Sequence, residues 1–417
     1  MLNLLRQRNF ALLWFGGLIS FIGDWILFVG LPVYVYQMTG SVLATGIMFV
    51  VGRLPSIAFG SVAGVFVDRW DRKRTMVVAN LVVVPLLMPL LLVDSPDRVW
   101  IVYLVSLATN TVRQFMDPAE NALLPKLVDK DDLATANALN TLNNNLARLI
   151  GPAIGGVVLA LFYFPVTVLL DAISFVVAGG MIALISAPSS VTRADPVTAG
   201  EAEGKGGVRR EWVEGLKIVR NNRVVASLFA LLGVNMIAEG ILSVLMVIFV
   251  QAVLGGGSVE VGWLLTAQAV GGLVGSLLVG KVSRAIRAWQ MVWVGFVLLG
   301  VIDMIIFNSG VLWVALILMA VVGVPVTLLQ TGVMTLFQAS VEDRFRGRVI
   351  GAFGTVSALL LMSSMAFTSL FGEQIGIVPM LSAAAFLDIV AGVVAWRLLR
   401  GIEKVEQTVV PEQTLAA

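Results

Sequence analysis

The sequence predicts an all-α membrane protein with twelve transmembrane helices, arranged as two six-helix bundles with both termini in the cytoplasm. Three observations predict this fold: an apolar composition, twelve long apolar runs, and basic residues that fall in alternate loops. Of the 417 residues, 58% are hydrophobic and only 13% are charged, and the mean hydropathy is +0.95. A soluble chain is about half apolar and about a quarter charged. Too few charged side chains are present to cover a water-facing surface, so lipid is the expected solvent.

The apolar runs define the individual helices. A helix crosses a bilayer core with roughly 20 apolar residues. Runs of about this length fall at residues 10–36, 41–67, 75–93, 98–123, 138–163, 165–187, 224–251, 259–282, 289–308, 311–337, 349–371 and 377–399. The first run follows Arg6 and Arg8 and is too long for a signal-peptide core, so we expect it to be retained.

The lysines and arginines test the number of spans. With both ends inside, the inner segments hold Arg6, Arg8, Arg69, Arg72, Lys73, Arg74, Lys126, Lys130, the stretch 188–223, Lys281, Arg284, Arg287, Arg344, Arg346, Arg348 and the tail. Only Arg53, Arg98, Arg113 and Arg148 fall elsewhere. Cytoplasmic loops are enriched in basic residues, and a missed helix would destroy this alternation.

The chain divides into two related halves. We expect an N-terminal bundle at 1–187, a cytoplasmic linker at 188–222, a C-terminal bundle at 223–402 and a tail at 403–417. The halves correspond at an offset of about 215 residues, which is typical of transporters built from parallel repeats. Asp24 then corresponds to Glu239, and Asp171 corresponds to Asp388.

The linker contains one amphipathic pattern. Four apolar residues recur there at helical spacing among charged ones: Val208, Trp212, Leu216 and Val219. This pattern predicts either a helix on the inner membrane surface or a solvated linker helix.

The composition excludes several function classes. The chain has no cysteine and no histidine, so disulfides, Cys/His metal sites and His-based catalysis are ruled out. The net charge of the chain is +2. Because the basic residues are spread over short loops, no nucleic-acid partner is expected. Residues 275–281 match a phosphate-loop spacing, but they lie inside an apolar run and Val282 replaces the required Ser or Thr. We expect no cofactor and no metal.

Ionisable residues inside the apolar runs are the candidate functional residues, because charge in a membrane is costly and usually functional. Asp24 and Glu239 could hold a proton or neutralise a cationic substrate, and Asp24 could instead form a fixed pair with a cation such as Arg53 or Arg148. Arg53, Arg113 and Arg148 cannot carry the proton, but each could bind a carboxylate or an anionic group. For Asp171, Asp303 and Asp388 we favour structural pairing.

A second group of candidates lies at the inner ends of the helices. Asp68 and Arg69 stand in the short loop after the second run, with Arg72 and Lys73 close behind. A carboxylate there could pair with arginines or cap a helix, and so act as an inner lock. Asp117 and Glu120 lie near the inner end of the fourth run, where a gate or a bracing role is expected.

The loop motif resembles the cytoplasmic signature of the major facilitator superfamily of transporters. The match lies at Gly64, Asp68, Arg69, Arg72 and Lys73 and departs at Asp71. Within that superfamily the chain is most similar to the bacterial macrolide efflux and enterobactin exporter branch, as in Arg8-Asn9-Phe10 and Gly23-Asp24-Trp25. The fifth run resembles the glycine–proline motif associated with exporters, at Gly151, Pro152, Gly155 and Gly156, with Ala147 in place of a glycine.

The resemblance implies a major facilitator fold in the cytoplasmic membrane of a prokaryote. It further implies a monomeric secondary transporter that exports a small molecule against protons by a rocker-switch mechanism. Lipophilic or amphipathic substrates are expected. Import, facilitated transport or lipid flipping on the same fold is the alternative. A membrane-embedded enzyme and a non-transporting receptor are the hypotheses from other classes.

Overall fold

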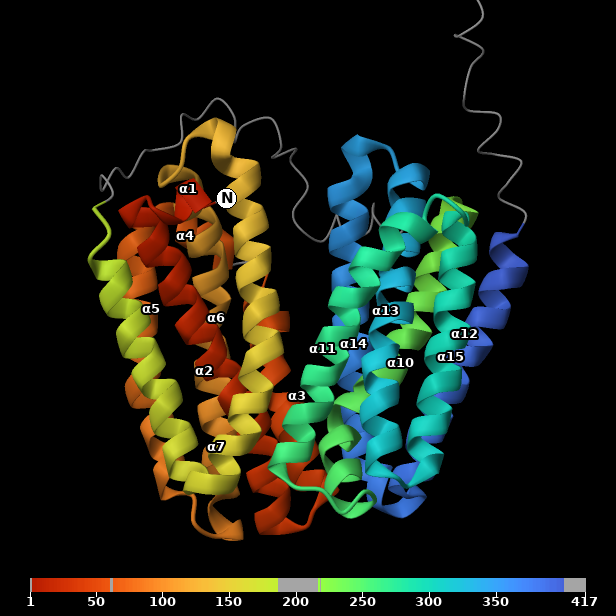
Figure 1. The fold of residues 1–417 in the computed structure, drawn as a ribbon, viewed down its shortest axis with the longest axis horizontal. Helices are drawn as coiled ribbons and strands as arrows, with labels where there is room; N and C mark the ends of the chain where they lie inside the picture. Colours follow the sequence, from red (N-terminus) through yellow and green to blue (C-terminus); the bar gives the residue numbers. More distant parts are fainter. Residues whose placement is uncertain (1, 61–62, 187–216, 218, 401–417) are drawn as a thin grey trace, which may run out of the picture. The chain divides into compact units, whose positions relative to one another are not determined.

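Helices make up nearly all of the chain that can be described. The computed structural model describes residues 2–60, 63–186, 217 and 219–400, and within these residues it contains no strand. The α-helices (Figure 1) are α1 (Leu2–Leu5), α2 (Arg8–Thr39), α3 (Val42–Phe59), α4 (Ala63–Arg69), α5 (Arg72–Leu87), α6 (Val99–Leu123), α7 (Leu133–Ala183), α10 (Arg223–Ala252), α11 (Ser258–Val282), α12 (Ala288–Ser309), α13 (Leu312–Ser340), α14 (Asp343–Ile375) and α15 (Ile377–Leu399). Short 3₁₀ helices η1 (Met88–Leu92), η2 (Pro96–Arg98), η3 (Leu124–Lys126) and η4 (Lys130–Asp132) join some of them.

Membrane-spanning helices dominate this fold, as predicted. Ten helices in the described part are long and apolar enough to cross a bilayer. This number is consistent with the twelve predicted spans, for two reasons. Helix α6 carries Arg113, Asp117 and Glu120 and is not among the ten, and α7 is long enough to cross twice. The side of the membrane on which the termini lie stays a prediction.

Helix α7 contains a break that separates two spans. Its 51 residues would extend about 76 Å if straight, more than twice the roughly 30 Å of a bilayer core. At Tyr163 the backbone leaves the helical region, with φ 65° and ψ 167°. Pro165 follows two residues later and removes a backbone donor, which favours a break. The predicted boundary between residues 163 and 165 is confirmed.

The described residues form two compact units. Unit 1 contains α1–α7 together with Ser243–Ala269 and Met365–Ile377, and unit 2 contains the remaining described residues. In unit 1, α2 packs along α7, α3 packs against α6, and α5 packs against both α6 and α7. The predicted domain boundaries at residues 188 and 222 remain predictions, because 187–216 and 218 lie outside the described residues.

Two buried hydrogen bonds fasten α2 to α7 in unit 1. The indole Nε1 of Trp14 donates to the backbone oxygen of Leu139 at 2.8 Å. The amide of Asn143 donates to the backbone oxygen of Trp14 at 2.6 Å. Phe10, 1% exposed, packs in the same apolar cluster. These contacts fix the register of α2 against α7 near the start of both helices.

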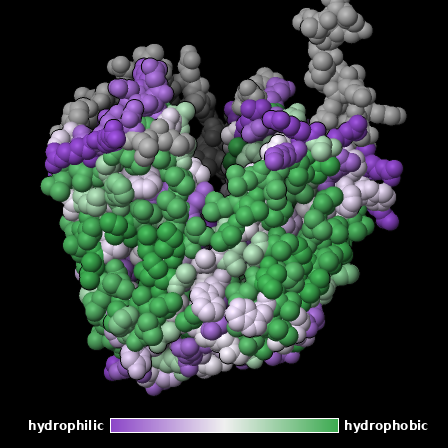
Figure 2. Space-filling view, viewed as in Figure 1, coloured by the Kyte–Doolittle hydropathy of each residue, from purple (hydrophilic) through white to green (hydrophobic). Residues whose placement is uncertain are grey.

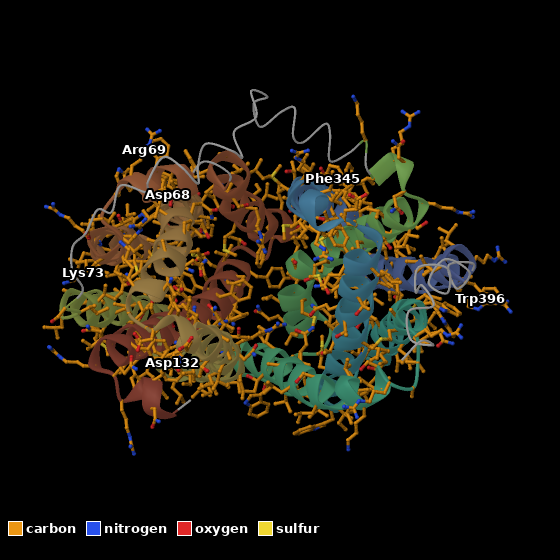
Figure 3. The ribbon with its side chains drawn as sticks, turned by 90° about the horizontal axis from the view of Figure 1, so that it is seen from above. Asp68, Arg69, Lys73, Asp132, Phe345 and Trp396 are labelled. Atoms are coloured by element: carbon orange, nitrogen blue, oxygen red, sulfur yellow. The ribbon has the colours of Figure 1, made fainter. Side chains whose placement is uncertain are left out.

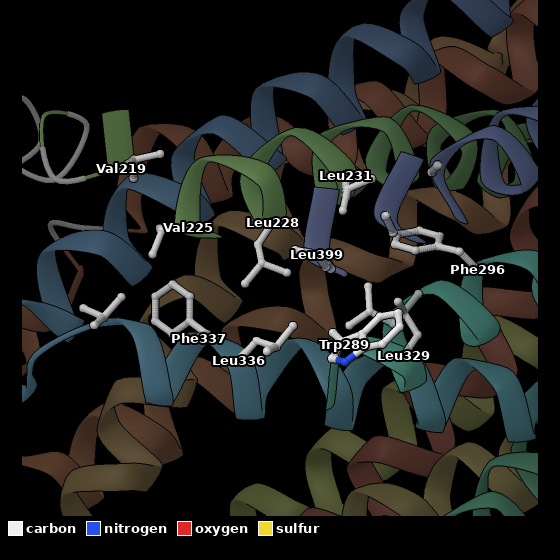
Figure 4. Close-up of a cluster of buried hydrophobic side chains, with 14 of the residues drawn as sticks. Val219, Val225, Leu228, Leu231, Trp289, Phe296, Leu329, Leu336, Phe337 and Leu399 are labelled. Carbon is white, nitrogen blue, oxygen red and sulfur yellow. The ribbon is translucent and has the colours of Figure 1, made fainter. Parts of the chain in front are cut away.

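Unit 2 is held by an apolar core (Figure 4). Leu228 and Leu231 of α10, Trp289 and Phe296 of α12, and Leu336 of α13 contribute to it. Val219, the last residue of the predicted amphipathic pattern, is also buried in this core. Val208, Trp212 and Leu216 lie outside the described residues.

The outer surface of each unit is apolar along the middle of its helices. Figure 2 shows hydrophobic side chains there, with hydrophilic ones towards the helix ends. Large apolar side chains are well exposed, among them Leu161 at 65%, Leu277 at 77% and Ile317 at 65%. Such a surface is stable only when lipid covers it.

Candidate functional site

An ion pair between α2 and α6 forms the centre of the candidate site. The Nη2 atom of Arg113 donates to Oδ1 of Asp24, about halfway along both helices. The side chains are 35% and 16% exposed, respectively. Of the partners left open by the sequence, Asp24 therefore takes neither Arg53 nor Arg148. At this depth the attraction between the two charges offsets part of the cost of removing both from water.

Arg113 is surrounded by further groups of unit 1. Its guanidinium lies over the ring of Phe175 in α7, 5.7 Å from the ring centroid. Such a cation–π contact stabilises a cation that has lost part of its water. Asp117 lies one turn further along α6 and, like Asp171 of α7, is close enough to interact electrostatically with Arg113. One cation thus faces three carboxylates.

Asp171 is the least accessible of these carboxylates. Its side chain is fully buried, and neither carboxylate oxygen has a hydrogen-bond donor among the described residues. The hydroxyl of Ser174, which also lies near the carboxylate, donates to the backbone oxygen of Asp171 at 2.7 Å. The carboxylate packs on the backbone of Gly23, where a Cβ would lie 2.8 Å from Oδ1.

The corresponding position in unit 2 is different. Asp388 of α15 is 3% exposed, and its Oδ1 accepts a hydrogen bond from the amide of Asn235 at 3.0 Å. Asp303 of α12 is 2% exposed and lies in electrostatic range of Asp388 and Glu239. Glu239 itself is exposed on α10. The repeat therefore preserves the acidic positions but not their surroundings.

The two other candidate arginines stand apart from the ion pair. Arg53 of α3 and Arg148 of α7 are both exposed. Among the described residues, neither forms an ion pair. Their predicted binding roles stay predictions.

The inner loop braces unit 1 through Lys73, one of the residues that the sequence predicts there. Figure 3 shows Asp68, Arg69 and Lys73 on one side of the ribbon. Asp68 and Arg69 are exposed and, within the described residues, form no ion pair. Lys73 instead donates from Nζ to the backbone oxygen of Ile185 at 2.7 Å. A cation at the C-terminal end of α7 also complements the helix dipole.

A second contact holds the same end of α7. The side-chain amide of Asn9 donates to the backbone oxygen of Ser186 at 3.2 Å, and its Oδ1 accepts from the Ser186 N–H at 3.0 Å. Asn9 belongs to the Arg8-Asn9-Phe10 pattern, and these two hydrogen bonds supply a structural reason for its asparagine. The end of α7 is therefore bound to the starts of both α2 and α5.

The remaining inner residues connect α5, α6 and α7. Asp71 caps α5 by accepting from the Arg74 N–H at 2.7 Å. Burial lowers the pKa of Lys126 in η3, and the nearby charge of Arg72 lowers it further. Glu120 near the end of α6 is within hydrogen-bonding reach of Asn140 in α7. The gate or bracing role of Glu120 stays a prediction.

The glycine–proline motif of α7 forms two close helix contacts inside unit 1. A Cβ on Gly151 or Gly155 would collide with Trp25 or with Ile26 of α2. On the neighbouring face, the hydroxyl of Ser258 in α11 donates to the backbone oxygen of Gly156 at 2.8 Å. Small residues allow this close approach.

On that face, Gly262 of α11 lies against the backbone of Pro152. The small residues of the motif therefore pack against α2 on one face and against α11 on the other.

The arrangement defines a polytopic membrane protein with a buried charge site among its helices, which is the usual construction of a transporter. Comparison with known proteins agrees. The model of the transmembrane secretion effector family matches residues 1–416. Macrolide efflux protein A of Streptococcus pyogenes is 25% identical over 383 residues, covering 89% of this chain and 91% of that protein. Multidrug efflux pump Tap of Mycolicibacterium fortuitum is 26% identical over 374 residues, covering 84% and 86%.

Solved structures share the fold. A bacterial homologue of the iron transporter ferroportin, in an inward-facing state, superposes with a TM-score of 0.73 at 16% identity, covering 94% of this chain and 98% of that one. The chain belongs to the transmembrane secretion effector family of major facilitator transporters. It is a multi-pass membrane transporter of small molecules and not an enzyme.

Proposed function

We propose that the chain is a proton-coupled exporter of lipophilic or amphipathic small molecules. The observation that carries the proposal is the Asp24–Arg113 ion pair inside the membrane, with the buried carboxylate of Asp171 beside it. Charged groups at this depth are costly and persist where function requires them. Because arginine keeps its proton, the carboxylates are the groups that can exchange one.

Two observations support the proposed substrate class. Both relatives described above are named for efflux, one of macrolides and one of multiple drugs. Three carboxylates in the spans of unit 2 lie close enough to repel one another electrostatically: Glu239, Asp303 and Asp388. Each unit therefore offers acidic groups that a lipophilic cation could neutralise.

Alternating access by a rocker-switch motion is part of the proposal. Each half would move as a rigid body around the charged residues, in the cytoplasmic membrane and as a monomer. The predicted inner lock of Asp68 and Arg69 would form in one state and open in another, and both side chains are exposed and able to take new partners. The close contacts of Gly151 and Gly155 with α2 would keep the N-terminal half rigid during the change.

Transport by inverted membrane vesicles tests the proposal. Vesicles with the wild-type chain are energised to an acidic interior and offered macrolides, cationic dyes and a fluorescent lipid. We expect accumulation of at least one drug, which stops when the pH gradient is collapsed. Accumulation that does not depend on the pH gradient would support the facilitator or flippase alternative. Gradient-driven loss of preloaded drug from these vesicles would support import.

A further inference from the structure

We propose that Asp171 is a proton-binding site of the transporter, occupied while Arg113 is paired with Asp24. Its role in coupling rests on the proposed function. Arg113 has one positive charge, and Asp24 already neutralises it through the ion pair. An ionised Asp171 would add a further negative charge to this part of unit 1, where Asp117 already lies near the same cation.

The surroundings of Asp171 do not support an ionised form. The side chain is fully buried, and among the described residues neither oxygen accepts a hydrogen bond, because the nearby hydroxyl of Ser174 donates to the backbone oxygen of Asp171 instead. A buried carboxylate without donors costs several kcal/mol when charged. A bound proton removes that cost, and the O–H group then needs only one acceptor.

The groups that face Asp171 are few. Helix α2 contributes Asp24, and α6 contributes Arg113 and Asp117. Helix α5 packs against α7, but its basic residues Arg72, Lys73 and Arg74 all lie in its first turn, away from this depth. Among these groups, Arg113 is therefore the cation that can compensate a negative charge on Asp171.

Unit 2 provides an internal comparison. The sequence places Asp388 at the position of Asp171, and there Asn235 donates a hydrogen bond to the carboxylate. The residue of α2 at the position of Asn235 is Ser20, which the offset of about 215 residues places four before Asp24. Unit 1 has thus kept the carboxylate without the amide donor.

The proton step follows directly. The O–H bond of Asp171 breaks, the proton leaves to water, and the carboxylate keeps the electron pair. The new negative charge then competes with Asp24 for Arg113. The group of four charged residues, Asp24, Arg113, Asp117 and Asp171, gains one net negative charge and can accept the cationic group of a substrate. The site therefore holds either the proton on Asp171 or the cationic substrate, but not both at once.

Infrared difference spectroscopy of the purified full-length protein near neutral pH tests the site without any substrate. The wild-type spectrum minus that of Asp171→Asn should contain the C=O band of a protonated carboxylic acid. The control Asp97→Asn removes an exposed carboxylate of η2 and should give no such band. Asp171→Glu should restore it. A difference spectrum that shows only an ionised carboxylate for Asp171→Asn would overturn the inference.

Transport in proteoliposomes separates this inference from the proposed function. With tetraphenylphosphonium as probe, we expect gradient-driven uptake by the wild type, at least a tenfold loss in Asp171→Asn and recovery in Asp171→Glu. If the band is present but transport is independent of the gradient in the wild type, the proposed function fails and the proton site stands. If Asp171→Asn keeps gradient-driven transport, the coupling role of Asp171 is overturned.

Discussion

The carboxylate of Asp171 rests on the backbone of Gly23, so that a Cβ at residue 23 would lie 2.8 Å from its Oδ1. Gly23 immediately precedes Asp24, which is paired with Arg113. Two carboxylates on different helices thereby meet at one turn of α2. The glycine is the reason that a second acid can lie so close to the ion pair.

Substitution of Gly23 by alanine should therefore disturb the site. The added methyl group must displace both Ser174 and Asp171, and overpacking of this kind costs about 1–3 kcal/mol. Thermal unfolding in detergent should show a lower midpoint. Gly17→Ala is the control on the same helix, because its Cβ would meet the nearest atom, Nδ2 of Asn143, at an ordinary 3.5 Å. Equal midpoints for both variants would contradict the close contact.

The ion pair predicts strong coupling between Asp24 and Arg113. Arg113→Gln leaves a carboxylate in the membrane without its cation, and Asp24→Asn leaves the cation without its carboxylate. Each single change should lower the free energy of unfolding. The double variant should lose less free energy of unfolding than the sum of the two single losses. A coupling energy of about 1–3 kcal/mol is expected for contacting residues. Additive losses in a denaturation cycle would show that the residues act independently.

The contact of Lys73 with the end of α7 predicts a local effect on stability. Lys73→Gln removes a charge-assisted hydrogen bond to the Ile185 backbone oxygen and should cost about 1–2 kcal/mol. Amide hydrogen exchange of residues 183–186 should become faster. Arg74→Gln, which changes an exposed neighbour, should leave that exchange unchanged. Faster exchange in both variants would point to net charge as the cause.

The predicted orientation can be measured because the chain has no cysteine of its own. Arg74→Cys places a thiol in the inner loop, and Asp97→Cys places one in the loop before α6. In intact cells a membrane-impermeant maleimide should label residue 97 and not residue 74. In inverted vesicles the labelling should be reversed. The opposite result would place the basic loops outside and contradict the charge pattern.

Most of the helices could be predicted because lipid imposes a simple rule of length and apolarity. Even the break in α7 was predictable, since Pro165 interrupts an otherwise continuous apolar run. Helix α6 shows the limit of the rule. Its Arg113, Asp117 and Glu120 make it less apolar, and the basic residues before α5 and after α6 support the prediction that it is a span.

The partners of the charged residues were less predictable. Asp24 and Arg113 are 89 residues apart, and the sequence analysis named Arg53 and Arg148, not Arg113, as examples of a cation that could pair with Asp24. The sequence favours structural pairing for Asp171, and it could not predict that the carboxylate accepts no hydrogen bond among the described residues, because this depends on how the helices pack. The signal available in the sequence was an acid in the middle of an apolar run with small residues nearby. The bond from Lys73 to Ile185 spans 112 residues and involves a backbone atom, which no pattern reveals.

Substrate-induced proton flux tests the central claim most directly. Proteoliposomes with an acidic interior and a trapped pH-sensitive dye receive tetraphenylphosphonium, macrolides or cationic dyes from outside. The account predicts that one of these compounds speeds the loss of internal protons for the wild type, and that Asp24→Asn abolishes this effect. If a compound is transported with no change in proton flux, or if Asp24→Asn behaves as the wild type, proton coupling through this site is contradicted.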